Sequence, residues 1–481
     1  MQYKWIALSV TSVGGIMAGL DIRILVIGLP TIAAQLHTGP EEVIWISQAY
    51  MLATTVSLLI FGRVADQFGR VRLYNLGFIV FTLGSGLASI SGNSFELIAF
   101  RAVQGIGYSL LSSSTAAIIT DATPKKELGL IMGISQTAFR AGAMSGLTLS
   151  GLILSFVNWR GLFYVNIPIG IFGTIWAYLK LREIGTSDTS KKIDWYGFGL
   201  FSSGLTLVLL AITFLSYGTG GYLEGGGFLA AGLVILMLFV KIESRQLSPM
   251  LDLKLFRDKL FAVANIAQLL VTTSWTGVTL LIAFYLELGL GYSPLNAGLG
   301  IIPLEAVYLV SAIIAGRLSD MYGSRLISTS GIFLLVASNV SMISLGTNSA
   351  YLGVALILSM FGIGIGMFNA PNISAIMSSV PMNRRGIAAS FRQTMFNIGS
   401  TISYGLIILF ITFGIPYSKL NPLLQGSVSL GAILAARTEF VHGFHIAAIL
   451  MAVLTAAAII PSAMRGSSVK KQIDEQQLEK N

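Results

Sequence analysis

The segment Gly62–Gly69 reads G-R-V-A-D-Q-F-G, and the segment Gly316–Gly323 repeats it as G-R-L-S-D-M-Y-G. Each copy follows the second apolar stretch of what we interpret as a unit of six such stretches. Two related halves with a short charged loop at matching positions are typical of a membrane protein built from repeats. The repeat therefore predicts an all-α membrane protein that contains two six-helix bundles.

The composition of the chain excludes an ordinary soluble protein. Hydrophobic residues make up 54% of it and charged residues 11%, whereas a soluble domain carries about 25% charged residues. The apolar residues come in blocks of about 20, the length that a helix needs to cross a bilayer. Such long continuous runs predict helices, because a barrel shows short alternating segments instead. We predict fourteen spans, near residues 5–27, 43–61, 73–91, 96–118, 128–157, 161–180, 196–216, 224–241, 260–286, 296–315, 326–345, 350–371, 387–412 and 440–462.

The positions of Lys and Arg predict how the chain is oriented. With the N-terminus inside, 23 of the 30 Lys and Arg residues lie in cytoplasmic segments, 3 in external segments and 4 within spans. Cytoplasmic loops of membrane proteins carry such an excess. We therefore expect a multi-pass protein of the plasma membrane with both termini in the cytoplasm. The same bias accounts for the net charge of +9, so we expect no nucleic-acid partner.

The positions of the spans and linkers predict that the chain is divided into four parts. They are an N-terminal six-helix bundle (1–182), two additional spans with cytoplasmic linkers (183–259), a C-terminal six-helix bundle (260–464) and a cytoplasmic tail (465–481). The predicted architecture is therefore two six-helix bundles plus two extra central spans, which gives 14 transmembrane helices. We expect the chain to act as a monomer.

Several stretches resemble a known family. The repeated loop resembles the signature loop of the major facilitator superfamily. Six further stretches resemble its fourteen-span drug:proton antiporter branch, namely Leu20–Pro30, Trp45–Tyr50, Arg101–Gly107, Trp159–Gly170, Leu251–Phe256 and Ser293–Gly298. The resemblance implies the major facilitator fold. It also implies a secondary active transporter, a proton-coupled exporter of multidrug type or of other small organic compounds that works by alternating access.

Two positions depart from that branch. Its span-5 motif reads roughly G-P-x-x-G-G, whereas Gly146–Gly151 reads G-L-T-L-S-G and lacks the proline. The branch carries a small polar residue two places after the acid of span 1, where this chain has Arg23. Proton-coupled or facilitated transport of an anionic metabolite is therefore kept as an alternative function.

Three charged residues within spans are our candidates for proton coupling. A charge inside a span costs several kcal/mol unless it faces water or a partner. Asp21 in the first span and Glu305, close to Pro303 in the tenth, are carboxylates that can exchange a proton. Arg101 matches the span-4 arginine that the resemblance associates with proton transfer. For each of the three, a fixed ion pair between spans is the alternative.

A wider set of embedded polar residues is predicted to bind the substrate. The predicted spans contain four arginines, one of which is Arg392, but only two acids. Guanidinium suits a carboxylate or phosphate, so an acidic group on the substrate is one way to balance them. Embedded amides more often join helices than contact ligands. The predicted substrate-binding residues are Asp21, Arg23, Gln136, Arg140, Asn265, Gln268, Glu305, Asn369 and Asn372.

The two copies of the repeated loop are predicted to form gates. An acid near a helix N-terminus is held by the helix dipole and by a neighbouring arginine. Exposed ion pairs contribute only about 1 kcal/mol or less, so such a contact can open in every transport cycle. The predicted gating residues are Gly62, Arg63, Asp66, Gly69, Arg70, Gly316, Asp320 and Arg325.

The sequence lacks residues that other classes of function require. The sequence has no cysteine and only three histidines, so we expect no metal site. The dipeptide Gly-Lys is absent, which excludes the phosphate-binding loop of an ATP-driven pump. We predict no enzymatic activity and no cofactor, and we expect a small-molecule substrate, protons and the lipid bilayer as partners. A membrane sensor on a transporter scaffold is the alternative from another class.

Overall fold

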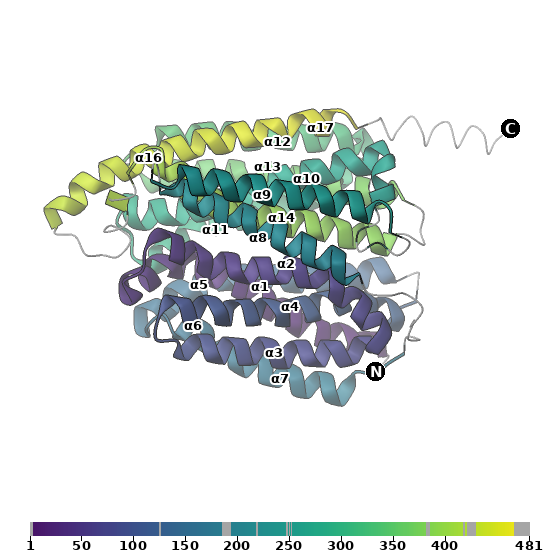
Figure 1. Cartoon of the computed structure of the whole chain (residues 1–481). Coiled ribbons are helices and arrows are strands. Elements are labelled where there is room, and N and C mark those ends of the chain that lie inside the picture. The colour runs from purple at the N-terminus through teal and green to yellow at the C-terminus, as the bar shows by residue number, and fades with distance from the viewer. Residues whose placement is uncertain are drawn as a thin grey trace. The chain divides into compact units, whose positions relative to one another are not determined.

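A computed structural model of the 481-residue chain describes residues 3–124, 127–184, 194–217, 220–246, 249, 251, 253–380, 385–416, 419–420 and 430–465. These residues form long helices and the segments that connect them (Figure 1). Twelve helical segments within the described ranges are long and apolar enough to cross a membrane. The chain is therefore an all-helical, multi-pass membrane protein, as the sequence predicts.

The fourteen predicted spans include two helices that are not among these twelve segments. α2 (Pro40–Phe68) and α4 (Ser94–Ala122) have 29 residues each, but neither is among the twelve. α4 carries Glu96, Arg101 and Asp121, and the side chain of Leu59 in α2 lies outside the described residues, to which the count of twelve is limited. The fourteen-span topology stays a prediction.

The helices belong to two compact units. The first unit comprises Met1–Leu251, Leu286–Leu299 and Pro416–Ala436, and the second comprises Asp252–Tyr285, Gly300–Ile415 and Arg437–Asn481. Each unit is described here by itself. The four-part division of the chain stays a prediction.

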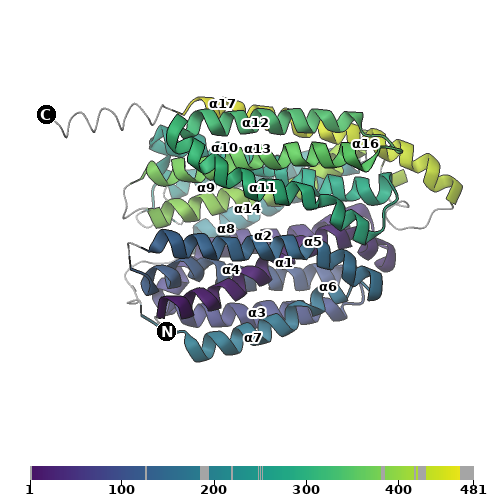
Figure 2. The same cartoon turned by 180° about the vertical axis from the view of Figure 1, so that it is seen from behind.

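The first unit contains α1 to α9. Besides α2 and α4 these are α1 (Tyr3–Leu36), α3 (Arg70–Ile90), α5 (Leu128–Phe156), α6 (Gly161–Tyr164), α7 (Asn166–Lys180), α8 (Trp195–Ser216) and α9 (Tyr222–Glu243). α1 packs against α5, α4 packs against α2 and α3, and α7 packs against α3, as Figures 1 and 2 show from opposite sides. α8 and α9 form a hairpin next to α2, where Trp45 Nε1 donates to Thr213 Oγ1 at 3.0 Å.

Glycine allows the helices around two charged residues to approach closely. A Cβ at Gly19 in α1 would lie 2.1 Å from a backbone oxygen of α5, and a Cβ at Gly105 in α4 would lie 2.3 Å from one of α2. Lipid gives no hydrophobic drive between helices, so close backbone contact is a main packing device. Asp21 and Arg101 lie within one turn of these two glycines, which places both charges inside the packed unit.

The second unit contains the later helices, except that residues 294–299 and 430–436, at the starts of two of them, belong to the first unit. These helices are α10 (Lys259–Phe284), α11 (Pro294–Tyr322), α12 (Ser324–Ser341), α13 (Tyr351–Ser378), α14 (Arg385–Thr412), α16 (Leu430–Ala457) and α17 (Ile459–Ala463), with the short turns η2 (Leu253–Arg257) and η4 (Met342–Ser344). α10 packs against α13 and α14, α12 packs against α13, and α17 packs against α10 and α12.

Several helices extend beyond their predicted ends, and three of them illustrate this. α1 continues past residue 27 through Pro30 to Leu36, because neighbouring groups can satisfy the backbone that a proline frees. α10 was predicted to end at 286, but the π-helical turn η3 (Tyr285–Gly289) continues it and brings Glu287 into a candidate span. α16 begins at Leu430, well before the predicted start at 440.

The repeated loop has the same backbone conformation in both units. Gly69 joins α2 to α3 with φ of 107°, and Gly323 joins α11 to α12 with φ of 87°. Glycine adopts this left-handed region without steric cost, whereas other residues rarely do. The sequence repeat is therefore also a structural repeat.

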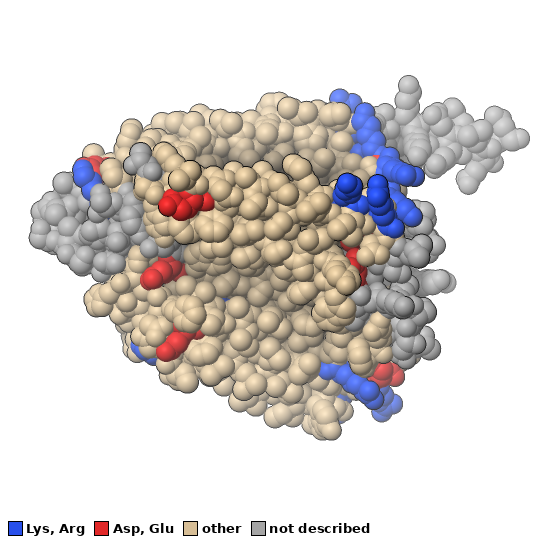
Figure 3. All heavy atoms as spheres, viewed as in Figure 1, with Lys and Arg blue, Asp and Glu red and all other residues tan. Residues whose placement is uncertain are grey.

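The surface has the charge distribution of a protein in a bilayer. Figure 3 shows Lys and Arg side chains near helix ends and uncharged residues along most of the helix length. In α9, Leu223 is 87% exposed and Met237 is 67% exposed. Large apolar side chains at such exposure suit hydrocarbon rather than water.

Candidate functional site

A buried ion pair joins α1 to α4 in the first unit. Arg101 Nη1 donates to Asp21 Oδ2 at 2.9 Å. Asp21 is completely buried, and Arg101 is 2% exposed. The arginine that pairs with Asp21 therefore comes from another helix, which was one of the alternatives left open for both residues.

Two amides complete the hydrogen bonding of this carboxylate. Asp21 Oδ1 accepts from Gln104 Nε2 and from Asn166 Nδ2, both at 2.8 Å. Gln104 Oε1 in turn accepts from Arg101 Nη1. Ser85 Oγ in α3 accepts from Gln104 at 3.3 Å and from Asn166 at 3.2 Å. Side chains from α4 and α7 thus bond to the carboxylate of α1, and Ser85 of α3 bonds to both amides.

Arg101 also has contacts that do not depend on Asp21. Its Nε donates to the carbonyl of Ile46 at 3.3 Å. Its Cζ lies 4.2 Å from the ring centroid of Tyr50 and 5.9 Å from that of Phe163. A guanidinium over an aromatic face is stabilised by about 0.5–2 kcal/mol. The cation therefore keeps favourable contacts when the carboxylate beside it is neutral.

The second unit holds a buried guanidinium of its own, at a residue that the predicted division assigns to the cytoplasmic tail. Arg465 is 1% exposed, its Nη1 donates to Ser328 Oγ at 3.0 Å, and its Nη2 donates to Asn372 Oδ1. Asn372 donates to Gln268 Oε1 at 3.0 Å, and Gln268 donates to Thr272 Oγ1 at 2.8 Å. We call these five residues the Arg465 network. Burial lowers the pKa of Arg465 to about 10, so its side chain stays charged near neutral pH.

The amides predicted to bind substrate fall into different surroundings. Gln268 and Asn372 belong to the Arg465 network. Asn265 Nδ2 donates to the carbonyl of Phe261 in its own helix at 2.9 Å. Asn369, the remaining one of these amides, bonds to an aromatic side chain. Its Nδ2 donates to Tyr308 Oη at 2.9 Å.

Aromatic side chains from three helices of the second unit meet at that position. The ring centroid of Trp275 in α10 lies 5.7 Å from that of Tyr308 in α11 and 6.0 Å from that of Phe396 in α14. We call Trp275, Tyr308 and Phe396 the ring cluster. Glu305, which is buried, lies three residues before Tyr308 in α11. A predicted coupling residue and a predicted binding residue, Asn369, therefore both lie close to the ring cluster.

The remaining predicted residues lie elsewhere or outside the described side chains. Arg23 in α1 and Arg140 in α5 are half-buried. The side chain of Gln136 lies outside the described residues, and Glu287 is an embedded acid that our sequence count omitted. Sequence reasoning also missed Gln104 and Asn166 as partners of Asp21, although both lie in stretches that carry the family resemblance. Ser85 gave no signal, because a single serine in an apolar helix is common.

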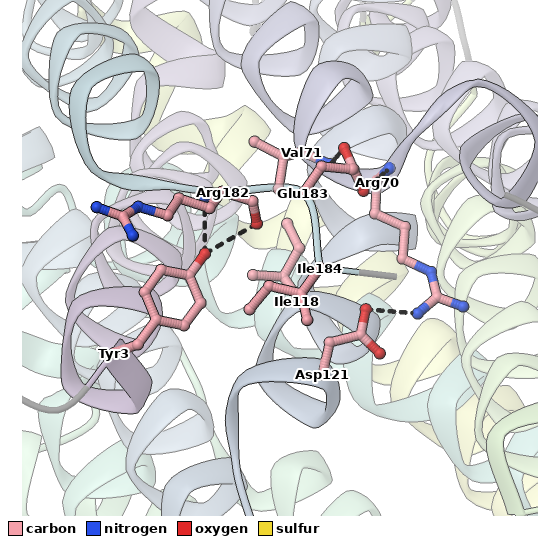
Figure 4. A pocket seen from close by; sticks show the side chains of 8 residues that line it. All are labelled: Tyr3, Arg70, Val71, Ile118, Asp121, Arg182, Glu183 and Ile184. Carbon is pink, nitrogen blue, oxygen red and sulfur yellow. Dashed lines mark hydrogen bonds and ion pairs between the residues drawn. The ribbon is translucent and has the colours of Figure 1, made fainter. Parts of the chain in front are cut away.

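The repeated loop of the first unit is joined to the segment that follows α7 (Figure 4). Arg70 Nη1 pairs with Asp121 Oδ2 at 2.6 Å. The Glu183 carboxylate accepts from the backbone N–H groups of Arg70 and Val71 at 2.9 and 3.0 Å. An acid at a helix N-terminus is stabilised by the helix dipole. These contacts fix the start of α3 to the ends of α4 and α7.

Other predicted gating residues are less well described. The side chains of Arg63, Asp66 and Asp320 lie outside the described residues, and Arg325 is exposed. A Cβ at Gly62 or Gly316 would meet nothing within 4 Å. The gating role of the repeated loop stays a prediction.

Comparison with known proteins identifies the family. Residues 11–404 match the model of the Major Facilitator Superfamily, and the chain belongs to this superfamily. It is 33% identical over 422 residues to the riboflavin transporter RibZ of Clostridioides difficile, which covers 87% of this chain and 91% of RibZ. It is 26% identical over 403 residues to the tetracenomycin C resistance and export protein of Streptomyces glaucescens, with 84% of this chain and 75% of that protein covered.

A solved structure has the same fold. It is a bacterial homologue of the human lysosomal transporter Spinster in an inward-facing, unoccupied conformation, with a TM-score of 0.70 and 15% identity over 96% of this chain and 97% of that one. The predicted family is thus confirmed, and family and relatives alike indicate a transporter rather than an enzyme. The fourteen-span branch within the family stays a prediction.

Proposed function

We propose that this protein is a secondary active transporter that exports small organic compounds in exchange for protons by alternating access. The observation that carries the proposal is the buried Asp21–Arg101 pair with its two amide donors. The carboxylate of Asp21 in α1 is bonded by side chains of α4 and α7, so its protonation affects all three helices. The names of relatives that export or transport small organic molecules support the substrate class.

Protonation of Asp21 would change the packing of the first unit. Hydrogen bonds to an ionised group are roughly twice as strong as neutral ones. A proton on Asp21 therefore weakens its bonds to Arg101, Gln104 and Asn166 at the same time. Arg101 retains Tyr50 and the Ile46 carbonyl. The two protonation states thus favour two arrangements of α1 against α4 and α7, as alternating access requires.

The proposal includes the finer sequence expectations. Glu305 is a second coupling acid, and Asn369 and the half-buried Arg23 and Arg140 contact the substrate. The repeated loops act as gates that open in each cycle. The chain crosses the plasma membrane fourteen times, has both termini in the cytoplasm and works as a monomer.

Riboflavin transport is a second candidate function. RibZ is matched over 91% of its length, whereas the tetracenomycin C exporter is matched over 75%. The case for an anionic metabolite is weaker than the sequence indicated. Arg101 is paired with Asp21, so this embedded arginine needs no acidic group of a substrate as its partner.

Reconstitution into proteoliposomes tests the proposal. With an imposed pH gradient, Asp21→Asn and Glu305→Gln should each reduce gradient-driven flux about tenfold or more, since neither variant can carry the proton. Substrate exchange without a gradient should persist, which separates lost coupling from misfolding. Glu224→Gln, at the exposed start of α9, is the matched control. Native gradient-driven flux in both test variants would refute the proposed coupling.

A further inference from the structure

The carboxylate of Asp21 is surrounded by hydrogen-bond donors. Arg101 Nη1 donates to its Oδ2 at 2.9 Å. Gln104 Nε2 and Asn166 Nδ2 both donate to its Oδ1 at 2.8 Å. An ionised carboxylate only accepts hydrogen bonds, whereas a protonated one also has an O–H group that donates. The arrangement therefore suits ionised Asp21, and a proton on Asp21 needs an acceptor that these three partners do not present to it.

An oxygen close to Asp21 can become that acceptor. Asn166 is completely buried, and among the described residues its Oδ1 has no hydrogen-bond partner. A buried acceptor without a donor costs about 1–3 kcal/mol. This oxygen belongs to the same amide whose Nδ2 contacts Asp21. Rotation of the amide about its Cβ–Cγ bond exchanges the two atoms and brings Oδ1 to the carboxyl group.

Neighbouring groups fix the orientation of this amide while Asp21 is ionised. The Ser85 hydroxyl donates to the carbonyl of Phe163 at 3.0 Å, so its oxygen accepts from Asn166 Nδ2 at 3.2 Å. The reversed amide would place Oδ1 against the carboxylate, where two acceptors repel each other. Oδ1 of Asn166 therefore points away from Asp21 until the carboxylate takes up a proton.

Gln104 is not able to respond in the same way. Its Oε1 accepts from Arg101 Nη1, so a reversed Gln104 amide would place its own donor against the guanidinium. Asn166 has no such constraint. When its amide reverses, it gives up its bond to Ser85 Oγ, which still accepts from Gln104 at 3.3 Å. The amide of Asn166 is thus the one that can reverse without bringing two donors together.

Other charged groups are not bonded to this carboxylate. Arg101 is the charged side chain that bonds to Asp21 in the described part of the chain. α5, which packs against α1, has Arg140 as its charged residue, and Arg140 is half-buried. α2 and α7 carry their charged residues in their first or last two turns, and α6 consists of uncharged residues. A proton on Asp21 therefore acts on Arg101 and on the two amides.

We propose that Asn166 is a positioning residue whose amide reverses when Asp21 takes up a proton. The proton, which comes from water, forms an O–H bond at Asp21 Oδ1, and Asn166 Oδ1 accepts from this new hydroxyl. The bonds of Asn166 Nδ2 to Asp21 and to Ser85 break. Asn166 begins α7 and Ser85 lies in α3, so each proton transfer makes or breaks a contact between these two helices. The inference rests on the proposed function, because it takes Asp21 to exchange protons.

Infrared difference spectra between neutral and acidic pH test the reversal in the purified full chain. Isotope labels on the side-chain carbonyls of asparagine identify their bands. We expect one asparagine band to move to lower frequency in acid, because Asn166 Oδ1 gains a donor and a hydrogen bond weakens the C=O bond. The same labels on glutamine are the control, and no glutamine band should move in this direction. A native spectrum without the asparagine shift would overturn the proposal.

Substitutions assign that shift to its residues. It should be absent in Asp21→Asn, which has no proton to exchange, and in Asn166→Leu, which has no amide. Gln104→Leu is the matched variant, because it removes an equivalent bond to Asp21 Oδ1 and leaves Asn166 in place. The shift should persist there. Thermal stability of each purified variant identifies misfolding. A shift that persists in Asn166→Leu, or that is lost in folded Gln104→Leu, would contradict the assignment.

Transport connects the reversal to the cycle. Asn166→Leu should reduce gradient-driven flux about 3- to 10-fold, the effect of about one hydrogen bond in one of two states. Native gradient-driven flux in folded Asn166→Leu protein would refute a role of the reversal in transport.

The spectra and the flux separate this inference from the proposed coupling. The asparagine shift in the native protein, with loss of gradient-driven flux in Asp21→Asn, supports both. Native flux in Asp21→Asn together with the asparagine shift would refute the coupling and leave the reversal as a response to protonation. Loss of flux in Asp21→Asn without an asparagine shift in the native protein would refute the reversal and leave the coupling.

Discussion

At the scale of single residues, the two units treat their buried guanidinium groups differently. Arg101 pairs with a carboxylate. Arg465 donates to the neutral side chains of Ser328 and Asn372 and lies 5.8 Å from the ring centroid of Phe368. In the proposed mechanism, exchange of a proton at Asp21 alters the first arrangement, whereas Arg465 serves as a fixed structural contact.

We predict that Arg465→Met destabilises the protein by about 1–3 kcal/mol, because it leaves Ser328 and Asn372 without their donor. The pKa of Arg465 is lowered by burial to about 10, so the folded state releases this proton only above that pH. From about pH 6 to about pH 9 both folded and unfolded chains keep the proton, and Arg465 adds no pH dependence.

The measurement is the melting temperature of native and variant protein across that pH range. The difference between the two should be constant. A difference that grows or vanishes within the range would show that a second titrating group is coupled to Arg465.

The sequence draws attention to some of these residues for a clear reason, although their roles stay predictions. Asp21 and Arg101 stand out because a charge in an apolar run is costly. Their pairing was one of several alternatives, since it depends on how α1 and α4 pack. Arg465 was assigned to a polar tail because its neighbours in sequence are polar, and its burial depends on contacts with α12 and α13. Trp275, Tyr308 and Phe396 come from three separate helices, so no local pattern relates them.

At the scale of helices and turns, the repeated loop sets where two helices end. Gly69 and Gly323 adopt a left-handed backbone that stops α2 and α11 and starts α3 and α12. A Cβ at Gly69 would also lie 2.8 Å from Glu183 Oε2, the acid that caps α3.

We predict that Gly69→Ala and Gly323→Ala each cost about 1–2 kcal/mol, the penalty of a left-handed conformation for an L-residue. Gly62→Ala and Gly316→Ala are matched controls at the first position of the same two repeated segments. Both lie within helices with open space at the Cβ, so they should stabilise by up to about 1 kcal/mol. Thermal unfolding of the four variants measures this, and equal shifts at all four positions would contradict it.

At the scale of the whole molecule, we predict that α2 crosses the membrane, as the fourteen-span topology requires. The chain has no cysteine, so single introduced cysteines can be labelled from one side at a time. Fourteen spans with a cytoplasmic N-terminus predict that Gln35→Cys and Phe413→Cys label from outside. The same topology predicts that Phe68→Cys and Ile184→Cys label from inside.

Intact cells and inverted vesicles, treated with an impermeant thiol reagent, supply the two sides. Labelling of Gln35→Cys and Phe68→Cys from the same side would show that α2 does not cross. Labelling of Ile184→Cys and Phe413→Cys from the same side would contradict the predicted orientation of the whole chain.

The position of Arg465 has a consequence for biosynthesis. Its partners Ser328 and Asn372 precede it by 137 and 93 residues. At about 5–20 residues per second, a ribosome takes on the order of 5–30 s to synthesise the chain between them. During that interval Ser328 and Asn372 are already translated but lack the guanidinium, so the nascent second unit depends on water, lipid headgroups or the insertion machinery to satisfy them. Its inner packing is therefore completed late in translation, when the chain that follows α17 emerges.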